Sequence, residues 1–255
     1  MKKPFASLCA ALLLGVAAGQ AQQAGGIPAI QSQAPFLAAA LSEFFSDTRA
    51  FTAGVEMTVP AMAGGESMKL PFGVAMADGK MRWELNLASV KSAELTPDAL
   101  TGLKGIGLDR MAFIYLPGKP LALLLPGMKS YVEMAVPKVE GVQKQAQEKI
   151  GRLEKTEVGR EVIAGQPTVK YAVKVPGDTG TATVWQATNL QNLPVKITIT
   201  KEKQTYQLQL SNVRLGQPDP AYFAVPAGFS KQADLGAAVS AAALKSFSES
   251  VGGIK

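Results

Sequence analysis

The chain has 255 residues, of which 47% are hydrophobic and 18% charged, values typical of a folded globular protein and not of a disordered one. Its formal net charge is +6 and its basic residues are scattered, which argues against a nucleic-acid-binding protein. This length suits one large β domain, and a single cysteine, Cys9, excludes an internal disulfide.

Residues 1–21 are predicted to be a cleaved secretory signal peptide. Two lysines precede the apolar stretch Phe5–Val16, and the small residues Gly19 and Ala21 precede a cut ahead of Gln22. Cleavage would leave 24 basic and 20 acidic residues and no cysteine. We therefore expect a periplasmic protein without thiol chemistry, with no more than weak attraction to an anionic membrane surface.

The segment after the signal peptide is predicted to lead into one folded domain. Residues 22–34 are rich in Gly, Gln, Ala and Pro, which is typical of a flexible leader. A helix is expected from Pro35, because Pro suits the first turn and an apolar stripe follows at Leu37, Leu41, Phe44 and Phe45. The domain is predicted to extend over residues 35–230.

Three strand-length segments between Arg49 and Ser89 alternate apolar and polar residues. The apolar residues occupy odd positions over 51–59, even positions over 68–76 and odd positions over 81–87. A period of two predicts antiparallel strands with one apolar face. Between the last two segments, Asp78-Gly79 predicts a type I′ hairpin turn, because both central residues of that turn need positive φ.

The middle of the chain predicts both helices and strands. Thr96 before Pro97 is typical of a helix N-cap, and Gly105 and Gly107 predict a mobile exit from this short helix. Strands are expected over 110–115, 121–125 and 129–136. Over 137–153 the apolar spacing changes to three and four residues, which predicts a long helix.

Strands return in the second half of the chain, over 169–175, 181–185, 195–199 and 206–215. Glu154 and Glu157 are interpreted as solvated surface, and residues 231–255 as a C-terminal helical tail. The predicted fold class is therefore mainly β (α+β), with a single curved antiparallel sheet wrapped around helices.

The residues needed for common catalytic chemistry are missing. The chain contains no His, which removes the usual general base and the commonest metal ligand. It also contains no nucleophile-elbow, phosphate-loop or dinucleotide-binding motif. We expect a protein without enzymatic activity, catalytic residues, metal or cofactor; an enzyme that uses carboxylates alone is the alternative.

The apolar face of the sheet is the feature that points to a ligand. The eight methionines after Met1 all fall between Met57 and Met134, where they serve either as core or as an adaptable lining for a lipid. Trp83 and Trp185 have the same two interpretations. The residues predicted to line an apolar cavity are Phe44, Val55, Met57, Leu70, Phe72, Met76, Trp83, Leu85 and Tyr131.

The order of elements resembles the LolA/LolB-like lipoprotein carriers, and is most similar to exported domains of unknown function related to that fold. The similarity covers residues 35–230. The segments that carry it are Asp78–Glu84, Met128–Tyr131, Gly159, Glu161–Gly165, Lys170-Tyr171, Trp185, Leu193–Lys196, Pro218–Pro220 and Phe223–Phe229. Pro167 lies near the position at which many relatives have a Cys, so their disulfide is not expected here.

This resemblance implies a half-barrel with a hydrophobic cavity. It implies a periplasmic protein that binds an acyl chain, a lipid or a lipoprotein, and acts as a carrier. No residue of this chain matches the Arg that governs ligand release in the carriers. The alternative is a protein-interaction or envelope-stress sensor module, in which helices of the chain fill the cavity and an envelope protein is the partner.

Overall fold

The computed structural model describes residues 50–60, 67–90, 96–134, 154–174, 180–201 and 204–252. The predicted signal peptide, the leader, the helix from Pro35 and the helix over 137–153 lie outside these ranges. The chain forms two compact units. Unit 1 comprises residues 1–49, 56–67 and 138–211, and unit 2 comprises residues 50–55, 68–137 and 212–255.

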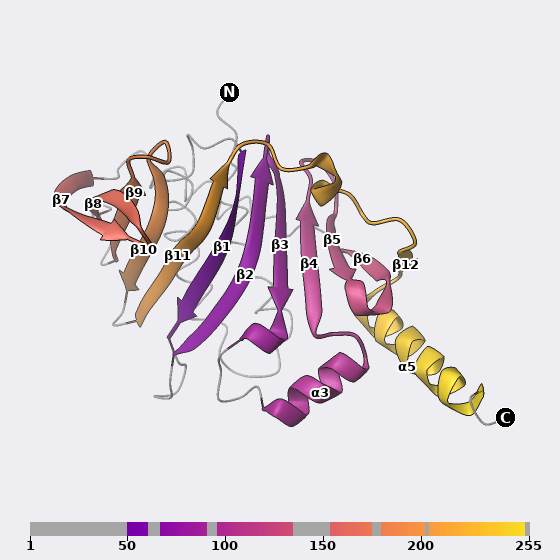
Figure 1. Cartoon of the computed structure of the whole chain (residues 1–255). Coiled ribbons are helices and arrows are strands. Elements are labelled where there is room, and N and C mark those ends of the chain that lie inside the picture. The colour runs from indigo at the N-terminus through magenta and orange to yellow at the C-terminus, as the bar shows by residue number, and fades with distance from the viewer. Residues whose placement is uncertain are drawn as a thin grey trace. The chain divides into compact units, whose positions relative to one another are not determined.

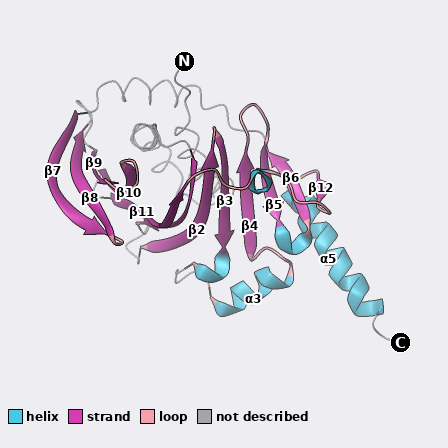
Figure 2. Cartoon of the chain, turned by 45° about the horizontal axis from the view of Figure 1, so that its top comes forward, coloured by secondary structure: helices cyan, strands magenta, loops and turns pink. Residues whose placement is uncertain are grey.

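Strands make up most of the described residues (Figures 1 and 2). Their order in the sheet is β12-β6-β5-β4-β3-β2-β1-β11-β10-β9-β8-β7, which confirms the predicted mainly β class with one open sheet. The strand β12 pairs parallel to β6, so the sheet is mixed. The strands β1 and β11 each contribute residues to both units.

Unit 2 contains most of the elements that position the candidate site. Its strands are β2 (Met68–Ala77), β3 (Lys80–Asn86), β4 (Arg110–Tyr115), β5 (Leu121–Leu125), β6 (Ser130–Met134), β12 (Ser230–Gln232) and the start of β1 (Ala50–Val59). Its helices are α3 (Pro97–Gly105), α5 (Leu235–Gly252) and the short 3₁₀ turns η2 (Leu87–Ser89), η3 (Pro126–Met128) and η4 (Pro220–Phe223).

Unit 1 contains strands that are all antiparallel to their described neighbours. They are β7 (Glu154–Ile163), β8 (Gln166–Lys174), β9 (Thr181–Ala187), β10 (Leu193–Lys201) and most of β11 (Gln204–Leu215). The apolar residues Val173, Val184, Ile197 and Ile199 are at most 4% exposed and share one face. The alternation in the sequence therefore located this core correctly.

Local sequence signals account for several elements of unit 2. Asp78 and Gly79 have φ of 46° and 91°, and the register Ala77 to Lys80 closes the two-residue turn between β2 and β3 as predicted. Thr96 caps α3, since its Oγ1 accepts a hydrogen bond from the Ala99 N–H at 3.3 Å.

The C-terminal helix is confirmed as well. It begins at Leu235, where the Asp234 carboxylate accepts a hydrogen bond from the Ala237 N–H at 2.7 Å. Ala238 is 1% exposed, whereas Leu244 is 71% exposed. The start of α5 is therefore packed against unit 2, and the rest projects from it (Figure 1).

The strand β7 is an element that the sequence analysis missed. Glu154 and Glu157 are exposed, as predicted, but both belong to this strand, which is the last in the sheet order. Charged residues occur on both parities of β7, and a bulge between Glu157 and Gly159 shifts the register. Such a strand shows no period of two, so its sequence looks like a charged loop.

Residues 216–232, which we call the C-terminal strap, cover one face of the sheet in unit 2. Phe223 is 6% exposed and packs against Ala75 and Ala77. Phe229 packs against the buried cluster of Ala112, Ile114 and Leu124. We call this surface the Ala75 face; the strap ends in β12, which extends the sheet beyond β6.

Hydrogen bonds that involve side chains fasten the strap along its length. They run from Arg82 Nη1 to Tyr222 O (3.0 Å), from Gln217 Nε2 to Asp78 Oδ2 (3.1 Å) and from Lys231 Nζ to Glu133 Oε2 (2.6 Å). Glu133 also raises the pKa of Lys231 through this hydrogen bond. The Ala75 face is therefore occupied by the chain itself.

The glycine-rich exit of α3 is held in place and is not a free segment. Gly107 is buried with φ of 75°, and its backbone lies against that of Gly127 in η3. A Cβ on Gly127 would lie 2.6 Å from the Cα of Gly107, and a Cβ on Gly107 would lie 2.9 Å from the carbonyl carbon of Gly127. Two glycines far apart in the sequence thus allow two turns to touch.

We expect Gly127→Ala to lower the free energy of unfolding by about 1–3 kcal/mol, because the new methyl group forces two backbones apart. Gly102→Ala is the matched control. Its Cβ would meet no atom within 4 Å, and alanine in the middle of α3 should raise stability by about 0.5–1 kcal/mol. Urea denaturation of both variants measures the difference; equal effects would contradict the close approach.

Candidate functional site

The register of β2 to β6 assembles an apolar surface on the side opposite the strap. Directly opposed residues of paired strands share a face, so Val74, Trp83 and Phe113 lie side by side across three strands. We call this surface the Trp83 face. Its middle row consists of Val74, Trp83, Phe113, Leu123 and Val132.

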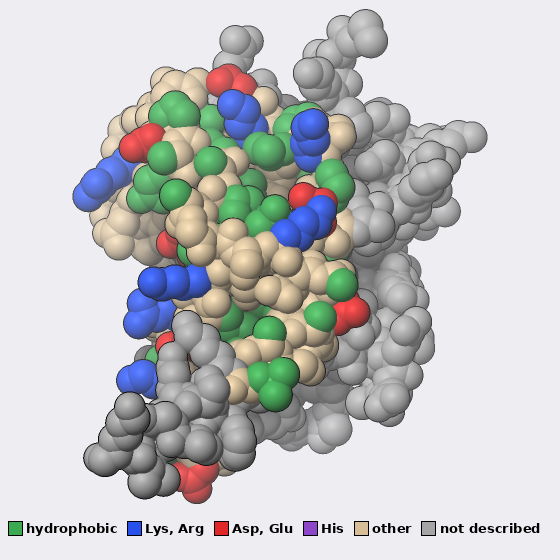
Figure 3. All heavy atoms as spheres, turned by 90° about the vertical axis from the view of Figure 1, so that its right-hand side faces the viewer, with side chains coloured by type: hydrophobic (Ala, Val, Ile, Leu, Met, Phe, Trp, Pro, Cys, Tyr) green, Lys and Arg blue, Asp and Glu red, His purple; other side chains and the backbone are tan. Residues whose placement is uncertain are grey.

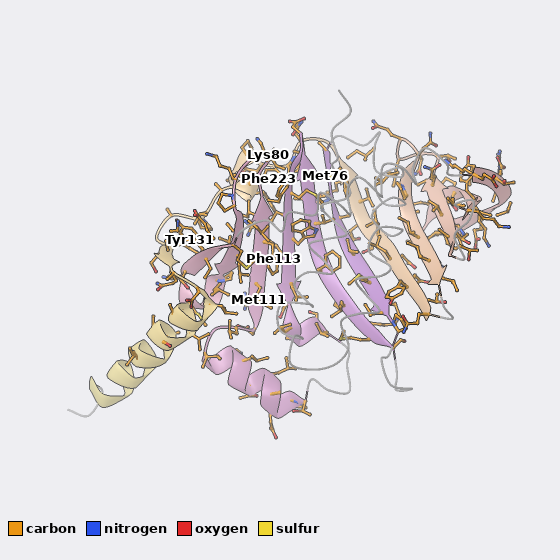
Figure 4. All side chains as sticks on the ribbon, turned by 180° about the vertical axis from the view of Figure 1, so that it is seen from behind. Met76, Lys80, Met111, Phe113, Tyr131 and Phe223 are labelled. Atoms are coloured by element: carbon orange, nitrogen blue, oxygen red, sulfur yellow. The ribbon has the colours of Figure 1, made fainter. Side chains whose placement is uncertain are left out.

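Two further rows flank the middle row. The methionine row begins with Met76, Met81 and Tyr115, and the Phe72 row begins with Phe72, Leu85 and Met111. Leu121 pairs with Met134, and Leu125 pairs with Ser130, so the same two rows continue over β5 and β6. The three rows contain no charged side chain. Figure 4 shows unit 2 from behind, with Met76, Phe113 and Met111 labelled.

Burial varies among the residues of the Trp83 face. Met76, Met81 and Trp83 are only 4–5% exposed and therefore belong to the core. Phe72, Leu85 and Met111 are half-buried. Solvent thus still reaches these three large apolar side chains, as it reaches Tyr115 and Met134 in the methionine row. A ligand can gain contacts with Phe72, Leu85 and Met111 without opening the core.

Six of the predicted lining residues share this face. Phe72, Met76, Trp83 and Leu85 lie in the three rows, and Leu70 has the parity of Phe72 in β2. Val55 is 5% exposed in the half of β1 that belongs to unit 2. Ala50 packs beside the cluster of Ala75 and Ala77, so the odd residues of β1, including Val55, face the Trp83 side.

Three predicted residues are not brought to this surface. Tyr131 pairs with Leu124 and packs against the cluster on the Ala75 face, beside Phe229. Its neighbour Val132 is the residue of β6 that takes part in the middle row. Met57 belongs to unit 1, and Phe44 lies outside the described residues.

The sequence interpretation missed Met111, Phe113, Leu123 and Leu125. Each lies in a strand whose bounds were predicted correctly, and each alternates with residues of the Ala75 face. The alternation of 111, 113 and 115 was the available signal. It could not tell which parity joins Trp83, because that depends on the register between β3 and β4.

Unit 1 contains a separate polar cluster around Trp185. The indole N–H donates to Glu161 Oε1 at 2.6 Å, and Lys170 and Lys196 lie over the ring at 5.1 and 4.7 Å from its centroid. The hydrogen bond from Trp185 holds the pKa of Glu161 below its usual value, and the positive charges of Lys170 and Lys196 act in the same direction. Since Trp185 is 6% exposed, this cluster anchors the edge strand β7 across β8 to β9.

We expect Trp185→Phe to destabilise the protein more at pH 7 than at pH 3. A lowered carboxyl pKa in the folded state contributes stability above the unfolded-state pKa, near 4.3, and this contribution is lost as pH falls through the folded-state pKa. The variant removes the N–H that lowers the pKa, so the difference between the two proteins should shrink in acid.

Denaturant unfolding at both pH values measures this difference, and Glu161→Gln provides the control. In the Glu161→Gln background, the Trp185→Phe substitution should have the same effect at pH 7 and pH 3. If Trp185→Phe also destabilised the wild-type protein equally at both pH values, this would contradict the role given to the indole N–H.

The described residues indicate neither a metal site nor a membrane span. Within them, no group of three His, Cys, Asp or Glu side chains is placed to hold a metal ion. None of the helices in these ranges combines the length and apolar character needed to cross a bilayer. The view toward the β12 side shows basic, acidic and apolar side chains intermixed (Figure 3).

No protein-family model matches the chain, and no curated protein matches it. Among solved structures, it is similar to an uncharacterized conserved protein from Thermus thermophilus (11% identity, TM-score 0.44, 80% of this chain and 99% of that one). A LolA superfamily protein from Nitrosomonas europaea also matches (11%, 0.33, 70% and 91%). So does the Pseudomonas aeruginosa MucA/MucB complex (15%, 0.42, 70% and 56%), of whose matched chain this sequence spans just over half.

The LolA superfamily, which the order of elements in the sequence resembles, is thus represented among the matching structures. At these identities and TM-scores the neighbours carry no activity, ligand or partner over to this chain. The assignment of a function depends on the Trp83 face itself.

Proposed function

We propose that this is a periplasmic, non-enzymatic protein that binds an acyl chain, a lipid or a lipidated protein on the Trp83 face. The observation that carries the proposal is the half-buried group of Phe72, Leu85 and Met111 beside the buried side chains of Trp83, Met81 and Phe113 on an uncharged surface. When an apolar ligand covers large apolar side chains that are partly exposed to water, the free energy of the system falls.

The free energy of burying an acyl chain is large enough to bind a lipid. Each buried CH₂ contributes about 0.8 kcal/mol, so about ten carbons contribute roughly 8 kcal/mol before the loss of translational and rotational freedom is subtracted. An affinity near the micromolar range corresponds to about −8 kcal/mol. We therefore expect an acyl chain to need about twelve carbons to bind with micromolar affinity.

The methionines of this face suit a ligand without fixed shape. Met76, Met81, Met111 and Met134 come from β2, β3, β4 and β6, and of these Met111 and Met134 are half-buried and can contact a ligand. The unbranched thioether side chain adapts to irregular apolar contacts at little cost. Such a lining favours chains of varying length or saturation over one rigid molecule.

Native mass spectrometry of the protein purified from the periplasm, followed by organic extraction, tests the proposal. We expect co-purifying lipid or acylated peptide, or uptake of added dodecanoic acid by a protein that is isolated empty. A protein that takes up neither fatty acid nor phospholipid but retains a stable protein partner would overturn the proposal. That result would favour the protein-interaction module.

We expect Leu85→Asp to weaken fatty-acid binding at least about tenfold, because the ligand would have to cover a carboxylate in the centre of the Phe72 row. Asn86→Asp is the matched control. Asn86 is exposed on the opposite parity of β3, and its side chain accepts a hydrogen bond from the Ala88 N–H, which aspartate also does. Titration calorimetry with dodecanoic acid measures both affinities.

Leu85 is a better site for this test than Trp83. Trp83 is 5% exposed, so a charge there would unfold the protein and would say nothing about binding. Circular dichroism must show both β3 variants folded. Equal affinity of folded Leu85→Asp and Asn86→Asp would remove the Phe72 row from the site.

A further inference from the structure

A buried hydroxyl lies at the end of the Phe72 row. Ser130 in β6 is 3% exposed, and its Oγ has no hydrogen-bond partner among the described residues. It pairs with Leu125, which is fully buried, so an apolar side chain is its direct cross-strand neighbour. A hydroxyl removed from water without a partner destabilises the fold.

The position of this hydroxyl follows from the register. Phe72 pairs with Leu85, and Leu85 pairs with Met111. Because Ala112 pairs with Leu124 in an antiparallel register, the next residues, Met111 and Leu125, lie side by side. Leu125 in turn pairs with Ser130. Four strand spacings of about 4.8 Å separate Phe72 from Ser130, so the row is roughly 19 Å long, the length of a long acyl chain.

The surroundings of Ser130 become polar beyond the row. Ser230 in β12 pairs with Ser130 and is exposed, and Gln232 Nε2 donates to Ser230 Oγ at 3.2 Å. The Phe72 row thus runs from half-buried apolar side chains, past the fully buried Leu125, to a hydroxyl beside an exposed residue of β12. This sequence of environments matches a molecule with an apolar tail and a polar end.

Building on the proposed function, we propose that the ligand is an acyl chain whose carbonyl or carboxylate oxygen accepts a hydrogen bond from Ser130 Oγ–H. Its tail lies along Met111, Leu85 and Phe72, and its polar end lies at the β6–β12 edge. A free fatty acid and an acyl ester share this oxygen. The hydroxyl that lacks a partner in the free protein gains one in the complex.

Because Ser130 is buried, the carbonyl or carboxylate oxygen of the ligand can reach it only when an element that packs on β6 moves aside. Of the described helices, α5 packs against β6 and β12. Its docked first turns bury small side chains such as Ala238, while Leu244 farther along is exposed. Leu235 and Val239 in these turns are half-buried, so a shift of α5 gives up part of their apolar burial, which an entering acyl chain offsets.

Ser130→Ala and Ser230→Ala test the inference as a matched pair, because both remove one hydroxyl from the same row. The probes are dodecanoic acid, methyl dodecanoate and dodecyltrimethylammonium, which has the same chain but no acceptor oxygen. We expect Ser130→Ala to weaken binding of an oxygen-bearing probe roughly 3- to 10-fold and to leave the ammonium probe unchanged. Ser230→Ala should change each affinity less than about twofold.

The pattern of losses separates the possible outcomes. If Ser130→Ala weakens binding of dodecanoic acid alone, the ligand is a fatty acid whose carboxylate contacts Ser130. If it weakens binding of both oxygen-bearing probes, Ser130 contacts the acyl carbonyl. Equal loss for all three probes, or no loss for any, overturns the role of Ser130 while the proposed function stands. If no probe binds the wild-type protein, the proposed function fails and the inference fails with it.

The stability of the free protein gives a second, independent readout. Removing a buried hydroxyl that has no partner should raise the unfolding midpoint in Ser130→Ala. A lower midpoint would show that Ser130 Oγ is already hydrogen-bonded in the free protein. That result would overturn the inference even if the variant bound lipid poorly.

Discussion

The pairing register of β2 to β6 is the constraint on which the surfaces of unit 2 depend. Side chains alternate along a strand, so a shift of one residue would exchange the Trp83 face for the Ala75 face. The hairpin turn at Asp78-Gly79 fixes the first pairing, because only two residues separate β2 from β3 and both adopt positive φ. From this turn the register determines that Trp83 lies between Val74 and Phe113.

The two faces that result differ in the size of their side chains. The Ala75 face is rich in alanine, and small side chains allow the strap to approach closely while Phe223 and Phe229 supply the bulk. The Trp83 face has the large side chains: Phe72, Trp83, Leu85 and the methionines. A small-residue face suits a segment that is always present, and a face of large flexible side chains suits a partner whose shape varies.

How much of this could be predicted from sequence depended on the range of the interaction. The Asp78-Gly79 turn, the Thr96 cap and the strands β4 and β5 are determined within a few residues, and the sequence predicted them correctly. The assignment of Tyr131 to the lining was inconsistent with its own strand, in which Val132 and Met134 share the other parity. Features that depend on residues far apart in the chain had no local signal. The contact between Gly107 and Gly127 requires two turns to meet, and the three-residue strand β12 exists because β6 offers an open edge to the strap.

Under the proposed function, the graded burial of the Trp83 face separates the residues that stabilise the fold from the residues that contact the ligand. Met76, Met81 and Trp83 contribute mainly to the core, because they are almost completely buried. Phe72, Leu85 and Met111 are only half-buried, so substitutions there change less of the folded protein's buried area. If the proposed function holds, substitutions at Phe72, Leu85 and Met111 change the ligand preference, while the buried side chains of Met76, Met81 and Trp83 keep the sheet folded.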